Sequence, residues 1–338
     1  MKQRQTELDI LRLLATLAVI VIHMGRIPYV ADCWAKSPVE MSISPLVWCV
    51  PVFFMISGRF FLDPTKNITL KTLFQKYIFR LILAFAVWSA VYTAYYTWDG
   101  TYSSLNIFGI LTMYIRGPIH FWYLYAAVGL YLLTPLLRKL VKDKAVCVYL
   151  LALLAMYNIA TQYLIYIPKV GGILEDTLKR LGLESLNGYV VCFLLGYVLY
   201  AYQEQITKKW ETAIFLLSVF LLVMTYILDI SISEELRAAD FVKQYQKPNV
   251  IFFSAGIYLF FVKRVSKIEF SPKIRRLFAR TTECGFGVYI LHALVIDLVT
   301  LTGWNVKPIL LLVILILVVS MLLSFCVRKI PKIGKLIT

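Results

Sequence analysis

Long apolar segments recur along the whole chain, and the stretches between them hold most of the charged residues. Each segment has about the ~20 residues that a helix needs to cross the hydrocarbon core of a bilayer. The segment 105–115 is too short to cross and is assigned to the membrane surface. The predicted fold class is therefore an all-α integral membrane protein, a bundle of about ten transmembrane helices. The predicted spans are 8–26, 44–62, 76–97, 119–138, 145–166, 187–203, 210–229, 248–264, 282–302 and 306–327.

The composition of the chain supports this class. Of its 338 residues 60% are apolar and 16% are charged, whereas a soluble domain is about half apolar and about a quarter charged. No stretch between the spans suggests a second globular unit, so residues 1–338 are predicted to form a single transmembrane domain without a separate soluble domain. No clean cleavage site follows the basic N-terminus and the first apolar run, so that run is predicted to be retained.

The net charge is strongly positive, with 35 Lys and Arg against 19 Asp and Glu, or +16. In a soluble protein this excess would be compatible with nucleic acid binding. Here most of the basic residues flank apolar segments, so we predict a multi-pass protein of the cell membrane, with the lipid bilayer and not nucleic acid as its partner. With the N-terminus inside, the cytoplasmic loops hold about twice as many Lys and Arg as the outer loops, which predicts that both termini are cytoplasmic.

The chain has three histidines, and each lies in or beside a membrane-length apolar segment. Ionisable groups at membrane depth are costly and usually face a cavity, and imidazole moves protons readily near neutral pH. Residues His23, His120 and His292 therefore predict a site inside the membrane. The six cysteines contain no C-x-x-C pair and the histidines are far apart in sequence, so no metal site is predicted.

The first span places two polar side chains on one face. Arg12 and His23 are eleven residues apart, which is three helical turns and about 16 Å along the axis. Asp9 lies three residues before Arg12, close enough to pair with it. The alternative is that Asp9 and Arg12 anchor the helix at the interface while His23 extends outward.

The second and third spans carry basic residues close to their predicted cytoplasmic ends. Ser57-Gly58-Arg59 closes the second span, and Lys76 and Arg80 lie one turn apart at the start of the third. With Arg12 they would form a basic tier suited to a polyphosphate, because guanidinium binds phosphate through two hydrogen bonds. Membrane topology predicts the same basic residues, and Gly58 is also typical of close helix packing.

The fourth and ninth spans hold the other two histidines among aromatic residues. His120 begins the fourth span at its outer end, at about the level of His23, so the two could line one cavity. Trp122 and Tyr123 follow it, although an aromatic belt at the membrane interface would contain the same residues. Tyr289 and His292, three residues apart, share a face of the ninth span.

At these residues the chain resembles the acyltransferase-3 family of multi-pass membrane acyltransferases. Four motifs run in the order of that family over nearly the whole chain. They are Leu8-Asp9-x-Leu11-Arg12 with His23, Phe53-Phe54-x-x-Ser57-Gly58, His120-x-Trp122-Tyr123-Leu124 with Gly129-x-Tyr131-Leu132-x-Thr134-Pro135, and Gly287-x-Tyr289-x-x-His292. The chain departs from the family in having Arg59 after Ser-Gly, and Lys76 and Arg80 in place of a denser arginine cluster followed by proline.

The resemblance implies a ten-helix bundle that uses a cytoplasmic acyl-CoA, usually acetyl-CoA, to acylate a hydroxyl, typically on a cell-envelope carbohydrate or related lipid-linked acceptor. Arg12 and His23 match the essential arginine–histidine motif of the family. We therefore expect an O-acetyltransferase-like enzyme in which His23 is the general base and Arg12, steadied by Asp9, orients the donor. Direct transfer and an acyl-histidine relay are both open, and a homo-oligomer is compatible with the sequence. CoA is expected to contact Arg80, Lys76, Arg59 and Ser57, and the acceptor His120, Trp122, Tyr123, Tyr289 and His292.

Two other function classes compete with an enzyme. A transporter or exporter of envelope polysaccharide or of a small polar solute also buries polar residues near the midplane. Such proteins often have two similar halves, whereas here each histidine motif occurs once. A receptor or scaffold would explain the topology but would give the polar motifs no purpose.

Overall fold

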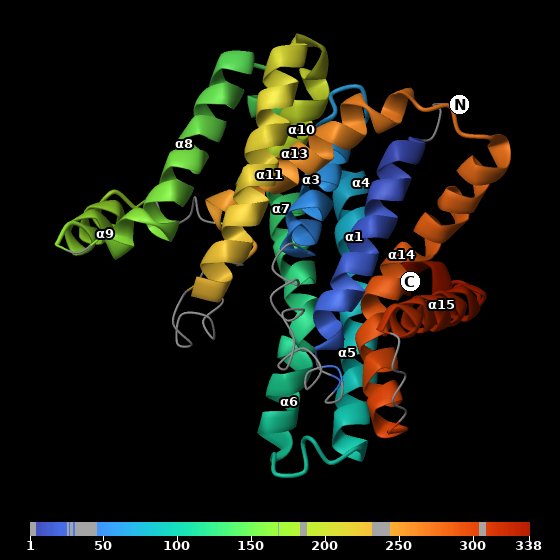
Figure 1. Cartoon of the computed structure of the whole chain (residues 1–338). Helices are drawn as coiled ribbons and strands as arrows, with labels where there is room; N and C mark the ends of the chain where they lie inside the picture. Colours follow the sequence, from blue (N-terminus) through green and yellow to red (C-terminus); the bar gives the residue numbers. More distant parts are fainter. Residues whose placement is uncertain are drawn as a thin grey trace.

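The computed structural model describes residues 5–25, 27, 30, 46–167, 169–182, 188–231, 244–303 and 309–338, which contain helices and no strand (Figure 1). A helix overlaps each of the ten predicted spans; the span ends at residues 26, 44–45, 187 and 306–308 lie outside the described ranges. The principal helices are α1 (Thr6–Met24), α3 (Cys49–Leu62), α4 (Leu70–Thr72), α5 (Phe79–Trp98), α6 (Ile107–Arg116), α7 (Trp122–Leu140), α8 (Lys144–Gln162), α9 (Gly171–Arg180), α10 (Val190–Ala201), α11 (Lys208–Ser231), α13 (Pro248–Lys263), α14 (Pro272–Leu301), α15 (Ile309–Arg328) and α16 (Gly334–Ile337).

Helix length and composition confirm an α-helical membrane protein. Within the described ranges six helical stretches are long and apolar enough to cross a bilayer. Three shorter apolar helices accompany them, and the prediction of ten spans stays a prediction. The six stretches are Leu70–Trp98, Ile119–Leu140, Lys144–Gln162, Pro248–Lys267, Pro272–Leu301 and Ile309–Arg328.

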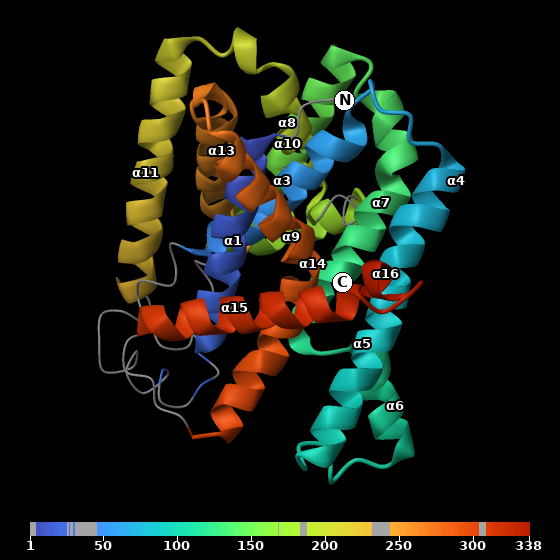
Figure 2. The same cartoon turned by 90° about the vertical axis from the view of Figure 1, so that its right-hand side faces the viewer.

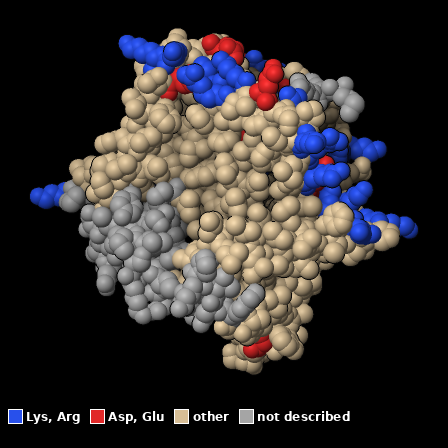
Figure 3. Space-filling view, turned by 45° about the vertical axis from the view of Figure 1, so that its right-hand side comes forward, with Lys and Arg blue, Asp and Glu red and all other residues tan. Residues whose placement is uncertain are grey.

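The surface of the protein separates charge from hydrocarbon. Figure 3 shows Lys and Arg, with some Asp and Glu among them, along the upper and right-hand rim of one face, a broad uncharged area below them, and a small acidic spot at the lower end. Large apolar side chains are exposed to a degree that would be costly in water, among them Leu216, Leu310 and Leu322. Such a surface suits contact with lipid acyl chains, while the cytoplasmic location of the termini stays a prediction.

Helices α3 and α10 are in direct backbone contact at two glycines. A Cβ atom on Gly58 would lie 1.8 Å from the carbonyl oxygen of Phe193, and one on Gly196 would lie 2.0 Å from that of Met55. Only glycine permits this approach. Gly58 therefore has a packing role, and the contact fixes the neighbouring Ser57 relative to the centre of the bundle.

Helix α15 lies crosswise against the other long helices (Figure 2). It packs on α14 where Gly287 faces Ser324, because a Cβ on Gly287 would come within 2.1 Å of the serine Oγ. The same Oγ donates to the carbonyl oxygen of Cys284 at 3.2 Å. This crossing brings Leu317 and Met321 of α15 to the central cavity described below.

Helix α1 lies between α3 and α14 and also contacts α13 and α15. Its residues Leu11, Ala15, Ile20 and Met24 are buried against these neighbours. With those positions facing the surrounding helices, the remaining face of α1 is free to line a cavity.

Candidate active site

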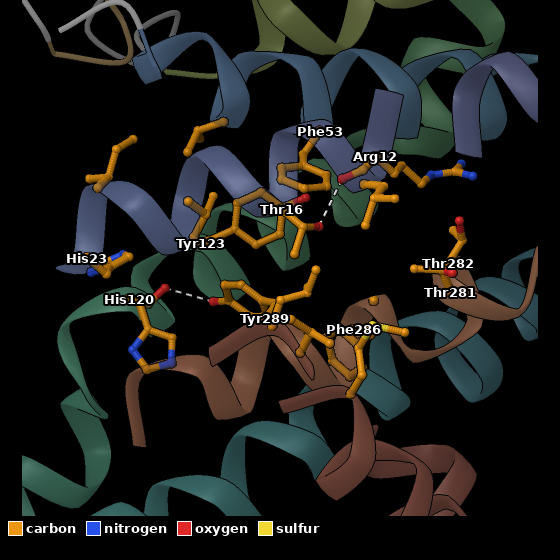
Figure 4. Close-up of a pocket in the computed structure, with 18 of the residues that line it drawn as sticks. Arg12, Thr16, His23, Phe53, His120, Tyr123, Thr281, Thr282, Phe286 and Tyr289 are labelled. Carbon is orange, nitrogen blue, oxygen red and sulfur yellow. Dashed lines mark hydrogen bonds between the residues drawn. The ribbon is translucent and has the colours of Figure 1, made fainter. Parts of the chain in front are cut away.

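A cavity of about 380 Å³ lies between α1, α3, α7, α14 and α15 (Figure 4). Residues far apart in sequence line it together, including most of those singled out by their motifs. The predicted site residues that line the cavity are Arg12, His23, Ser57, His120, Trp122, Tyr123 and Tyr289. The predicted residues that do not line it are Asp9, Arg59, Lys76, Arg80 and His292.

One face of α1 runs the length of this cavity. Arg12 and His23 lie toward opposite ends of it, with Thr16 between them (Figure 4). Arg12 Nη1 donates to Asp9 Oδ1 at 3.0 Å, and the side chain of Asp9 is 4% exposed whereas that of Arg12 is 34% exposed. The buried carboxylate thus has its counter-charge, and the guanidinium, which has five N–H donors, lies toward one end of the cavity.

The three imidazoles meet at the other end of the cavity. The ring centroid of His23 lies 5.1 Å from that of His292 and 6.1 Å from that of His120, and the latter two are 5.1 Å apart. His23 is half-buried, whereas His120 and His292 are buried. His292 stands behind the lining and touches both of the imidazoles that face the cavity.

Backbone carbonyls fix the tautomers of two of these rings. His292 Nδ1 lies 2.7 Å from the carbonyl oxygen of Tyr289, and His120 Nε2 lies 3.3 Å from that of Ile290. A carbonyl oxygen only accepts, so each of these nitrogens carries a proton. In the neutral rings the other nitrogen then has a lone pair, and both rings lie beside the ring of His23.

Tyr92, which the sequence did not single out, shapes α14 around His292. Its hydroxyl donates to the carbonyl oxygen of Ile290 at 2.8 Å and accepts from the amide of Leu294 at 2.9 Å. These two groups would bond to each other in a regular helix, so the Tyr92 side chain bridges one turn of α14. The same carbonyl of Ile290 is the partner of His120, and α5 therefore holds both histidine-bearing elements in place.

Tyr289 also supports His120. Its hydroxyl donates to the carbonyl oxygen of His120 at 2.7 Å, as Figure 4 shows. Its ring lies 5.7 Å from that of His120 and 5.4 Å from that of Tyr123. Because its hydroxyl proton is used in this bond, Tyr289 fixes the 3₁₀ turn that carries His120 (Ile119–Phe121).

The end of the cavity near Arg12 is lined by hydroxyl groups and an aromatic ring of α14. Thr281 and Thr282 lie near Arg12, and Phe286 lies between them and Tyr289 (Figure 4). The spacing of 282, 286 and 289 places these residues on one face of a helix, so the same face that carries Tyr289 could have indicated them. The two threonines and Phe286 precede the motif Gly287-x-Tyr289-x-x-His292, so the motif alone does not indicate them.

Ser57 is central to the lining, whereas Arg59 is not part of it. Ser57 lies near the hydroxyl groups of Tyr123 and Tyr131. The guanidinium of Arg59 is buried against the ring of Tyr200, 3.8 Å from its centroid. Arg59 is two residues after Ser57 in the sequence. In a helix this spacing places the two side chains on different faces of α3.

The remaining predicted basic residues lie away from the cavity. Lys76 is exposed, near the ring of Tyr77. Arg80 Nη2 donates to the carbonyl oxygen of Thr338 at 2.8 Å, and its guanidinium lies 4.9 Å from the ring of Phe286. Of Lys76 and Arg80, only Arg80 approaches the cavity. It lies behind Phe286, which is a lining residue.

Stacked aromatic rings close one side of the cavity. Trp122 stacks on Tyr189 at 5.5 Å and on Tyr245 at 5.6 Å, and Tyr189 stacks in turn on Phe54 at 4.4 Å. Trp122 and Tyr245 both line the cavity. Trp122 and Tyr123 thus belong to the cavity wall.

The family model described as an acyltransferase domain matches residues 5–329. This match covers nearly the whole chain, so the protein belongs to the acyltransferase-3 family and is a membrane acyltransferase. Comparison with curated proteins and with solved structures gave no match.

Proposed function

We propose that this membrane acyltransferase moves an acyl group, acetyl in the first instance, from cytoplasmic acyl-CoA to a hydroxyl of a cell-envelope carbohydrate or lipid-linked acceptor. The observation that carries the proposal is one cavity with a guanidinium toward one end and imidazoles at the other. A guanidinium suits the phosphates of the donor, and an imidazole suits the removal of a hydroxyl proton.

The donor enters from the end marked by Arg12. Its nucleotide stays at that end, where Arg12 offers N–H donors and the hydroxyl oxygens of Thr281 and Thr282, whose protons go to backbone carbonyls, act as acceptors. Its acyl-bearing arm then passes between Phe53 and Phe286 toward the histidines. Binding by Arg59, Lys76 or Arg80, as the sequence predicts, requires that the nucleotide extend beyond this lining.

The transfer step needs one base and one leaving group. His23 accepts the proton of the acceptor hydroxyl while the oxygen attacks the thioester carbonyl carbon. A C–O bond forms, the C–S bond breaks, and the proton passes from His23 to the departing CoA thiolate. General base catalysis of this kind contributes about 10²–10⁴-fold in rate.

Two neighbours stabilise the proton on His23. The rings of His120 and His292 lie 5–6 Å from it by centroid, and in their neutral tautomers each keeps one nitrogen as an acceptor. They receive or share the proton during transfer. Tyr289 keeps His120 in position, while Trp122 and Tyr123 hold the acceptor against the aromatic wall.

The experiment is acyl transfer by the purified protein in lipid nanodiscs, with [¹⁴C]acetyl-CoA and a delipidated envelope glycan fraction as acceptor. We expect equal amounts of free CoA thiol and of labelled glycan. Binding of acetyl-CoA is measured separately by isothermal titration calorimetry. Protein that binds no acetyl-CoA, yet moves the glycan across sealed vesicles, would establish a transporter instead.

A further inference from the structure

A second cavity, of about 500 Å³, lies between α5, α6 and α14 and shares no lining residue with the first. The lower ends of these three helices lie in the lower part of the molecule in Figure 2. Its position beside the segment that leads into His120 places it next to the histidine end of the active site. We call it the outer groove and define it by Tyr96, Asp99, Tyr102, Arg116, Pro118 and Asp297.

Aromatic rings form one wall of the outer groove. The ring of Tyr96 lies 5.4 Å from that of Tyr102 and 5.3 Å from that of Tyr95, and all three are half-buried. The amide of Tyr102 donates to the carbonyl oxygen of Tyr96 at 2.9 Å, which folds the loop after α5 back onto that helix. The wall is therefore held in place by the backbone.

Hydrogen-bonding groups of both kinds stand around these rings. The hydroxyl of Tyr96 donates to Asp297 Oδ2 at 2.9 Å, and Asp99 and Arg116 lie on the same groove. Burial and the nearby Asp99 carboxylate raise the pKa of Tyr102, so its phenol stays a neutral donor over the physiological range. The groove thus offers carboxylate acceptors, phenol and guanidinium donors, and aromatic faces together.

This combination selects among ligand classes. A hydrocarbon chain would take the carboxylates of Asp99 and Asp297, which accept from Thr101 and Tyr96, out of water without adding a hydrogen bond, and an anionic ligand would meet two carboxylates for one guanidinium. A sugar unit matches both features, because its C–H face packs on an aromatic ring and its hydroxyls donate to carboxylates. The geometry points to a neutral saccharide.

The outer groove and the active site share a wall. The segment 117–119 lines the groove, and the next residue, His120, lines the active site. Gly117 has a φ of 67°, and a Cβ there would lie 2.9 Å from Ser89 Oγ, so the tight turn between the two sites requires glycine. Tyr92 continues the contact, with its ring 5.9 Å from Tyr96 and 5.5 Å from His120.

We propose that the outer groove binds a distal sugar unit of the acceptor while the acylated unit lies at the histidines. The assignment rests on the proposed function in taking the acceptor as a carbohydrate. It predicts that the enzyme favours oligosaccharides over single sugars, because only a longer chain reaches both sites.

The test is saturation-transfer NMR of the wild-type protein in nanodiscs with dextran, chitin, cellulose and rhamnan tetrasaccharides and with their monosaccharides. We expect at least one tetrasaccharide to bind, and Tyr102→Ala to weaken it about threefold to tenfold. Phe108→Ala, which removes an exposed aromatic ring of α6 outside the groove, should leave the affinity unchanged. Asp297→Asn keeps the shape of the groove and removes one carboxylate, so this second variant should also weaken binding of the tetrasaccharide. Binding by no tetrasaccharide, or equal affinity in all four proteins, would overturn the assignment.

Turnover separates this proposal from the proposed function. With acetyl-CoA and the tetrasaccharide that binds, Tyr102→Ala should raise KM for the tetrasaccharide and leave that for the monosaccharide unchanged. Transfer that proceeds equally in wild type and variant would reject the groove and keep the acyltransferase function. A tetrasaccharide bound at the groove but never acylated would reject the acceptor role and leave only a saccharide-binding site.

Discussion

The two ends of the central cavity differ in how firmly their side chains are held. At the histidine end, backbone carbonyls contact His120 and His292, and Tyr92 and Tyr289 fix the backbone around them. At the other end the Arg12 side chain is one-third exposed and is paired with the carboxylate of Asp9. The first arrangement suits proton transfer, which needs fixed geometry, and the second suits a donor that must enter and leave.

The largest effect should come from His23 at the fixed end. His23→Gln removes the base but keeps a polar side chain, so we expect kcat to fall about 10²–10⁴-fold while acetyl-CoA still binds. The measurement is thiol release together with calorimetry. Leu14→Ala, on the exposed side of the same helix, is the control and should keep both properties. A near-normal kcat for His23→Gln would contradict the assignment of proton transfer to the histidine end of the cavity.

Arg12 should behave differently, because it acts on binding. Arg12→Gln loses charge-assisted hydrogen bonds to the donor, and we expect KM for acetyl-CoA to rise about tenfold to a hundredfold with a smaller change in kcat. Arg59→Gln is the matched control, since its guanidinium is packed on Tyr200. An equal rise in KM for both variants would mean that the donor binds elsewhere.

The glycine contact behind the lining should matter for stability. Gly58→Ala places a methyl group against the backbone of Phe193, and we expect a loss of about 1–3 kcal/mol in the free energy of unfolding. Gly129→Ala, where a Cβ meets no atom within 4 Å, should be neutral or stabilising. Thermal unfolding followed by tryptophan fluorescence compares the two. Equal midpoints would show that α3 and α10 can separate without cost.

The smallest effect should come from Tyr92. In Tyr92→Phe the groups of Ile290 and Leu294 can bond to each other directly, so the loss of stability should be only about 0.5–1.5 kcal/mol. That closure would move the turn of α14 that bears His292. We therefore expect a several-fold lower kcat with unchanged acetyl-CoA binding, measured as for His23. Unchanged turnover would indicate that the fixed geometry is not needed.

Several side chains that line the cavity could be identified from the sequence. Ionisable side chains are rare inside membrane helices, so each histidine was informative, and helical periodicity was enough to place Arg12 and His23 on one face. Both line the cavity, together with Ser57, His120 and Tyr289. A helix also overlaps each predicted span within the described residues, and six helical stretches there are long and apolar enough to cross a bilayer.

Two features could not be predicted from the sequence: which of the basic residues reach the cavity, and the contact that Tyr92 makes with α14. Lys and Arg at helix ends serve membrane topology as well as binding, so their presence did not indicate which of them reach the cavity. Tyr92 lies on α5, which is apolar on nearly all sides, and a membrane helix of this kind has no polar face to show which side packs inward. The bridge that Tyr92 makes in α14 depends on a contact between helices about 200 residues apart.

The central claim is that the thioester lies in one cavity between Arg12 and His23. The most direct measurement is a structure of the protein in nanodiscs with a ketone analogue of acetyl-CoA, in which a methylene group replaces the sulfur. We predict that the phosphates lie at the opening near Arg12 and that the ketone lies beside the His23 ring. An analogue bound outside this cavity, or with its ketone away from His23, would contradict the account.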